Sequence, residues 1–161
     1  MNKITCFPVP YDDNYISLTS PQFSPPETSY VNASRIMFEG CPITFIAAQA
    51  PRPASFRHFW HMVIQEGVSV IMMITRLVEG KKRKADQYWP DQEQAVVEVG
   101  EGSRVELASS SYQGTYHLRR FTLWLPDGGM RQVPALTKPN LQVCQLQTED
   151  WPDLGAPEGP R

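Results

Sequence analysis

The chain has 161 residues, of which 41% are hydrophobic and 20% are charged, and its formal net charge at pH 7 is −2. The length is that of one domain, and the composition is typical of a globular protein. There is no excess of positive charge, and the one basic run, residues 81–84, is only four residues long. We therefore expect no binding to nucleic acid.

The N-terminus carries no apolar signal segment, and the longest apolar run, residues 68–74, is far too short to cross a membrane. Cys6, Cys41 and Cys144 form neither a Cys-x-x-Cys pair nor a metal-type spacing, and their odd number argues against a disulfide scaffold. We therefore expect reduced thiols, a cytoplasmic location, no transmembrane segment, no cofactor and no metal.

The first part of the chain predicts an irregular lead-in, then a hairpin and a helix. Residues 1–29 are rich in proline and short polar residues, which favour turns. Residues 30–36 alternate weakly and residues 44–49 form a better strand pattern, so we expect them to pair. Ser55 is placed to accept from the first amides of a helix that Gly67 would end. The apolar residues at helical spacing are Phe56, Phe59, Trp60, Val63 and Ile64.

The second part predicts a sheet. Residues 68–75 are apolar and rich in β-branched side chains with little alternation, which is typical of a central strand covered on both faces. Four further strand patterns are separated by glycines and turns, at residues 95–99, 103–108, 116–125 and 142–147. A helix packed on a mixed sheet gives an α/β (α+β) fold. The aromatic side chains Trp60, Trp89 and Phe121 are expected in its core.

Five segments resemble, in order, the protein-tyrosine-phosphatase domain. They read Tyr-Val-Asn-Ala-Ser at residues 30–34, Phe-Ile-Ala-Ala-Gln-Ala-Pro at 45–51, Phe-Trp-His-Met-Val at 59–63, Gln-Tyr-Trp-Pro at 87–90 and Trp-Pro-Asp-Leu-Gly-Ala-Pro at 151–157. The resemblance implies a mixed, twisted sheet with flanking helices, incomplete here. Residues 1–161 are then a partial domain, with a lead-in at 1–29, family segments over 30–157 and a tail at 158–161.

Resemblance to this family implies dephosphorylation of phosphotyrosine in a protein or peptide. In that reaction a cysteine thiolate attacks phosphorus while an aspartic acid protonates the leaving phenol. Asp153 stands at the general-acid position, with Trp151 and Pro152 in the same loop. Glu79 and Lys84 stand where the family has a mobile supporting loop, although a solvated charged loop is the alternative for these two.

The family's nucleophilic cysteine is followed six positions later by an arginine that clamps the phosphate. Six residues after Cys6, Cys41 and Cys144 stand Asp12, Ala47 and Asp150, and no Gly-rich loop accompanies any cysteine. We therefore expect a truncated family member that is inactive alone, because its acid has nothing to protonate. Two alternatives stay open. One is a pseudophosphatase-like module that binds a partner protein or phosphopeptide, and the other is a polypeptide that continues past residue 161 and is active.

Truncation would also affect the sheet. A family sheet cut before its last elements leaves apolar strand faces uncovered and a central edge unpaired. The loss of that cover would lower the stability of the chain by itself, because a whole domain has only about 5–15 kcal/mol in reserve.

Overall fold

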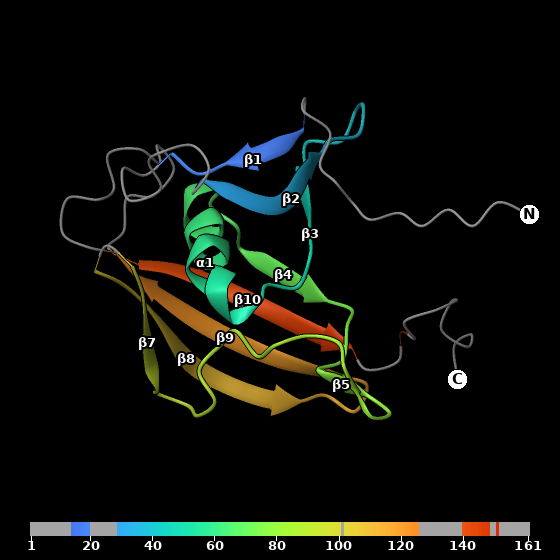
Figure 1. Cartoon of the computed structure of the whole chain (residues 1–161), viewed down its shortest axis with the longest axis vertical. Helices are drawn as coiled ribbons and strands as arrows, with labels where there is room; N and C mark the ends of the chain where they lie inside the picture. The colour runs from blue at the N-terminus through green and yellow to red at the C-terminus, as the bar shows by residue number, and fades with distance from the viewer. Residues whose placement is uncertain (1–13, 20–28, 101, 126–139, 149–150, 152–161) are drawn as a thin grey trace, which may run out of the picture. The chain divides into compact units, whose positions relative to one another are not determined.

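The structure of the protein is a computed structural model that describes residues 14–19, 29–100, 102–125, 140–148 and 151. The chain divides into two compact units, Met1–Gln49 and Ala50–Arg161. In the described ranges no helix is long and apolar enough to cross a membrane. Figure 1 colours the elements of both units from blue at the N-terminus to red at the C-terminus.

The N-terminal unit holds a three-stranded antiparallel sheet in the order β1-β2-β3. β2 (Tyr30–Ile36) pairs with β3 (Phe45–Ala48), which confirms the predicted hairpin. β1 (Tyr15–Ser17) pairs with β2 as well, so the prediction of an irregular lead-in is wrong at this point. Three residues are too few to show a period of two, but they include Ile16, which is 1% exposed and brings the segment into the core.

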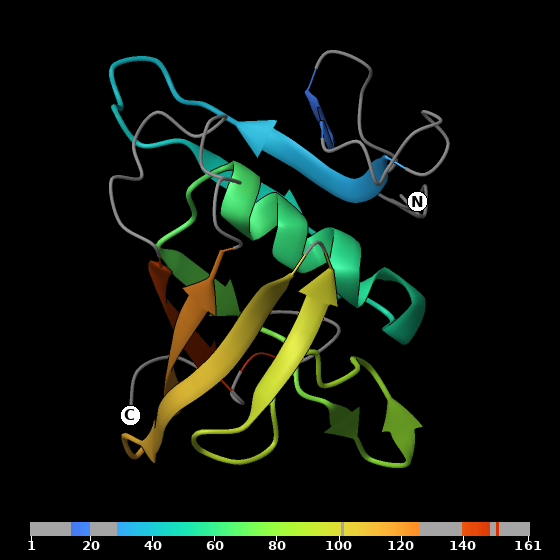
Figure 2. The ribbon, with the colours of Figure 1, turned by 90° about the vertical axis from the view of Figure 1, so that its left-hand side faces the viewer.

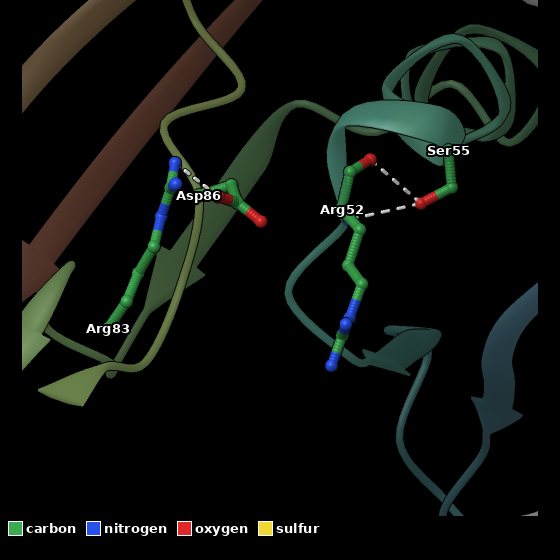
Figure 3. Close-up of polar contacts among 4 residues, drawn as sticks. All are labelled: Arg52, Ser55, Arg83 and Asp86. Atoms are coloured by element: carbon green, nitrogen blue, oxygen red, sulfur yellow. Dashed lines mark hydrogen bonds and ion pairs between the residues drawn. The ribbon is translucent and has the colours of Figure 1, made fainter.

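A short 3-10 helix, η3 (Pro53–Ser55), leads into α1 (Phe56–Gln65), where the helix was predicted. Gly67 follows the helix with a φ of +61°, the left-handed conformation that glycine adopts without strain. Ser55 does not cap α1 as predicted. Its hydroxyl accepts from the N–H of Arg52 at 3.0 Å and donates to the carbonyl of Arg52 at 3.1 Å (Figure 3), so it closes the 3-10 turn instead.

The C-terminal unit contains a five-stranded mixed sheet in the order β4-β10-β9-β8-β7. The strands are β4 (Val70–Met73), β7 (Val96–Gly100), β8 (Ser103–Tyr112), β9 (Tyr116–Trp124) and β10 (Asn140–Thr148). β10 runs parallel to β4, whereas the other neighbours are antiparallel. This twisted mixed sheet with a helix across one face (Figure 2) confirms the predicted α/β (α+β) class.

The strand β4 differs from its prediction. Residues 68–75 predicted a central strand covered on both faces, but among the described strands β4 is an edge. The side chains of Val70 and Met72 are 52% and 73% exposed, and that of Ile74, just beyond the strand, is 47% exposed. An apolar pattern shows which surroundings a strand suits, not whether a neighbour is present, and so the prediction failed. The described residues instead show an unpaired apolar edge, as expected for a family sheet that lacks its last elements.

The core of the C-terminal unit lies between α1 and the sheet. The rings of Trp60 on α1 and Phe121 on β9 have centroids 5.4 Å apart, and those of Phe59 and Tyr88 are 4.7 Å apart. Trp60, Phe121 and Trp89 are 1%, 0% and 7% exposed, which confirms all three as core aromatics. The indole N–H of Trp60 also donates to the backbone carbonyl of Tyr88 at 2.8 Å. Residues 85–89 are therefore held against the helix by both packing and a hydrogen bond.

Candidate active site

The residues assigned to the supporting loop lie on a hairpin that the sequence did not predict. β5 (Val78–Glu79) pairs with β6 (Lys82–Arg83), and Gly80 has a φ of +60° in the turn between them. The structure brings Glu79 and Lys84 together, with Lys84 Nζ at 3.8 Å from Glu79 Oε2. Both side chains are only partly covered, and such a pair contributes at most about 1 kcal/mol to stability. The pair suits a solvated charged loop equally well, so its catalytic role stays a prediction.

Two further contacts hold the base of this hairpin. The backbone N–H of Lys84 donates to the carbonyl of Leu77 at 2.9 Å, which closes the loop around the turn. Arg83 forms an ion pair with Asp86 (Figure 3), three residues farther along the chain. The Arg83 side chain is mostly exposed whereas that of Asp86 is mostly covered. The hairpin is thereby tied to the segment that enters the core at Tyr88.

The segment predicted to carry the general acid follows β10, the last strand of the described residues. β10 ends at Thr148, and Trp151 follows with 46% of its surface exposed. Pro152 and Asp153 lie outside the described residues. Of this segment the structure therefore describes only Trp151 and the strand that precedes it, and the strand is held by contacts that sequence reasoning missed.

A buried polar network holds the C-terminal end of β10. Gln145 and Gln147 are 0% and 4% exposed, and the Oε1 atom of each accepts from Nη1 of Arg119, at 3.0 and 2.9 Å. Nε2 of Gln145 donates to the hydroxyl oxygen of Tyr88 at 2.7 Å, and Nε2 of Gln147 donates to the backbone carbonyl of Thr75 at 3.2 Å. The network thus joins β9 and β10 to the chain beyond β4 and to residues 85–89.

Arg119 brings a positive charge into this network of amide groups. Its Cζ atom lies 4.5 Å from the centroid of the Trp89 ring, which places the cation over an aromatic face. Amide oxygens and an aromatic ring together compensate for part of the lost hydration. The available signal was the spacing of Gln145 and Gln147, two apart in a predicted strand and so on the same face.

The phenol of Tyr88 is the group whose acidity this environment changes most clearly. Burial raises the pKa of Tyr88 from 10.0 to about 12, while the hydrogen bond from Gln145 and the charge of Arg119 lower it in part. The hydroxyl therefore stays protonated throughout the neutral range. Its oxygen accepts from Gln145 and its own proton remains available to an acceptor.

Neither a metal site nor a nucleophile site is found in the described part of the chain. No group of three or more histidine, cysteine, aspartate or glutamate side chains is arranged there to hold a metal ion. Cys41 is an exposed free thiol and Cys144 a partly buried one. Cys144 lies on β10, paired with β4 and β9, rather than at the start of a phosphate-binding loop.

Comparison with known proteins gives a consistent result. The family model described as protein-tyrosine phosphatase matches residues 3–161. Receptor-type tyrosine-protein phosphatase alpha of Homo sapiens is 34% identical over 154 residues, which are 94% of this chain and 18% of that protein. Human tyrosine-protein phosphatases non-receptor type 14 and type 2 are 32% and 29% identical, over 93% and 94% of this chain. The chain spans 12% and 33% of the lengths of those two proteins.

The network around Arg119 should make a large contribution to stability. Arg119→Met keeps the apolar stem but leaves two buried amide oxygens without this donor, and we expect it to lower the free energy of unfolding by about 2–4 kcal/mol. Urea denaturation followed by tryptophan fluorescence measures the change. The matched control is Arg120→Met, at the next position of β9, which is exposed. We expect this substitution to change the free energy of unfolding by less than about 0.5 kcal/mol. Equal effects of the two substitutions would contradict the role given to the network.

The raised pKa of Tyr88 predicts a loss of stability in alkali. The folded chain holds the phenol proton more tightly than the unfolded chain, so the contribution is complete below pH 10 and is lost as the pH rises towards about 12. The free energy of unfolding should fall over that window by on the order of 3 kcal/mol from this group. Urea denaturation at a series of pH values measures the fall. Tyr88→Phe is expected to be less stable at every pH but to show a smaller alkaline fall; an unchanged fall would contradict the assignment.

Proposed function

Since this chain belongs to the protein-tyrosine phosphatase family, we propose that it carries the general-acid part of a phosphotyrosine-phosphatase site. Asp153 would protonate the phenol oxygen as the bond to phosphorus breaks, and Trp151 and Pro152 would shape the loop that carries it. Glu79 and Lys84 would support the site from the β5–β6 hairpin. The substrate would be a phosphotyrosine protein or peptide in the cytoplasm, where thiols stay reduced.

The chemical reason for an acid in this reaction is the leaving group. A phenolate expelled near neutral pH is a strong base, so a carboxylic acid within reach lowers the barrier by supplying a proton in the transition state. The observation that supports the proposal is the sequence Trp151-Pro152-Asp153 directly after β10. Because Gln145 and Gln147 hold the end of that strand in the core, the acid loop would leave from a rigid base.

We further propose that these 161 residues do not hydrolyse phosphate esters by themselves. A thiolate nucleophile needs a lowered pKa, and the phosphate it attacks needs a clamp of the kind that an arginine fork provides. None of Cys6, Cys41 and Cys144 is followed six residues later by arginine. Both the nucleophile and the clamp would have to come from outside these residues, and the reaction needs no cofactor or metal.

The activity of the isolated chain can be measured directly. We expect the purified 161-residue chain to release p-nitrophenol from p-nitrophenyl phosphate no faster than buffer does, and Asp153→Asn to behave in the same way. An active phosphatase of the family, assayed in the same buffer, is the positive control. Turnover by the unaltered chain that Asp153→Asn abolishes would overturn the inactivity while supporting the acid assignment.

A second candidate is a pseudophosphatase-like module that binds a partner protein or phosphopeptide without chemistry. The observation that favours it is the apolar surface beyond β2 in the N-terminal unit. Met37, Phe38 and Ile43 are 71%, 60% and 59% exposed, and Phe38 makes an edge-on ring contact with Phe45 at 5.8 Å. Exposed apolar groups gathered in this way often mark sites of protein interaction.

The module hypothesis predicts a chain that unfolds cooperatively and binds its ligand saturably. Urea denaturation tests the first property. Fluorescence polarisation with a labelled phosphotyrosine peptide tests binding, and the same peptide without phosphate is its control. A molten chain that shows no cooperative transition and binds both peptides equally weakly would rule out the phosphopeptide form of this candidate.

A further inference from the structure

The β5–β6 hairpin carries the most concentrated positive charge in the chain. Residues 76–86 contain five lysine or arginine side chains and two carboxylates, whereas the formal net charge of all 161 residues is −2. Lys81, Lys82 and Arg83, at and beside the turn, are all exposed. A cationic tip on a chain of net negative charge attracts anionic groups to this part of the surface in particular.

Lys81 and Lys82 differ from the other charged residues of the hairpin in their partners. The two carboxylates near them are engaged by other cations, in the ion pairs Glu79–Lys84 and Arg83–Asp86 (Figure 3). In the part of the chain that the structure describes, no ion pair involves Lys81 or Lys82. Both ammonium groups therefore keep their charge for a ligand.

Contacts at the turn and at the base fix the backbone that carries these two lysines. Gly80, in the turn, has a φ of +60°, which glycine adopts without strain. At the base, the N–H of Lys84 donates to the carbonyl of Leu77 at 2.9 Å, and Nε2 of Gln147 donates to the carbonyl of Thr75 at 3.2 Å. A ligand thus meets charges whose backbone is already in place, which reduces the entropy lost on binding.

We propose that Lys81 and Lys82 bind carboxylates that flank the phosphotyrosine of a protein substrate, so that the site prefers acidic sequences. This inference rests on the proposed function, in which Glu79 and Lys84 of the same hairpin support the site. An extended peptide and a strand both advance about 3.3 Å per residue. A carboxylate two or three residues from the phosphotyrosine is therefore separated from it by about the distance that separates Lys82 and Lys81 from Lys84.

The small size of the patch favours a peptide over a larger polyanion. Nucleic acids and anionic membranes present many charges, and proteins bind them through broad basic surfaces or longer basic clusters. Here the unpaired cations are two lysines on a short hairpin, in a chain whose net charge of −2 would repel an extended anionic surface. A lysine acts as a point charge without strict geometry, which suits carboxylates in varied sequences.

Fluorescence polarisation with labelled peptides measures this preference on the 161-residue chain. One peptide has a tyrosine with glutamates on both sides, and its twin has glutamines in their place. Neither peptide is phosphorylated, so the measurement depends on neither a nucleophile nor an acid. We expect the glutamate peptide to bind more tightly at about 20 mM salt, and about 200 mM salt should remove most of the difference, because exposed charges are screened.

Charge reversal at the tip tests the two lysines directly. Lys81→Glu combined with Lys82→Glu should weaken binding of the glutamate peptide by at least about ten-fold, and the corresponding pair of glutamine substitutions by a smaller factor. The matched control combines Arg104→Glu with Arg120→Glu, at exposed positions of β8 and β9, and makes the same change in net charge. It should weaken binding by no more than about three-fold, through long-range repulsion alone. Urea denaturation checks that every variant folds.

Several results would overturn the inference. They are equal affinity for the glutamate and glutamine peptides, a preference that survives charge reversal at the tip, and an equal loss of binding in the control variant. Tighter binding of a single-stranded oligonucleotide of the same charge, through the same lysines, would also overturn it and would identify a nucleic-acid site. The proposed function would stand in each case, because p-nitrophenyl phosphate, which has no flanking residues, tests it separately.

Discussion

The guanidinium of Arg119 donates to two buried glutamine amides, and the positions of several elements depend on this contact. It joins β9 to the end of β10, while the amide nitrogens of Gln145 and Gln147 extend the network to Tyr88 and Thr75. A partly buried charge of this kind is stabilised where polar groups and an aromatic face replace part of its water. These side-chain bonds thus link β9 and β10 to residues 85–89 and to the chain beyond β4, and they lie just before the segment predicted to carry the general acid.

Packing and hydrogen bonding support each other at Tyr88. Its ring lies against Phe59 and Trp60 of α1 and against Trp89, and its backbone carbonyl accepts from the Trp60 indole. Its hydroxyl at the same time accepts from Gln145. The residue thus links the helix to the sheet through an apolar body and a polar tip, which is the usual use of a buried tyrosine. The Gln-Tyr-Trp-Pro segment therefore connects the helix to the sheet in this chain.

Local patterns predicted those elements whose residues repeat with a clear period or end at a glycine. The helix from Phe56 was predicted because its apolar face recurs at helical spacing, and Gly67 follows its end at Gln65 because glycine adopts positive φ freely. The short pairs β1–β2 and β5–β6 were missed because two or three residues carry no measurable period. The hydroxyl of Ser55 was assigned to the wrong amides, since the 3-10 turn that competes for it was not foreseen.

The sequence by itself determined the family, and it carries the residues on which the proposed chemistry rests. Both depend on residue identity and spacing alone: Trp151-Pro152-Asp153 is present, and no cysteine is followed six residues later by an arginine. Only the tertiary structure decided that β4 is an edge among the described strands and that Arg119, partly buried, lies against Gln145, Gln147 and Trp89. Neighbours in a sheet come from distant parts of the chain, and whether a strand or a charge is covered depends on those neighbours rather than on its own sequence.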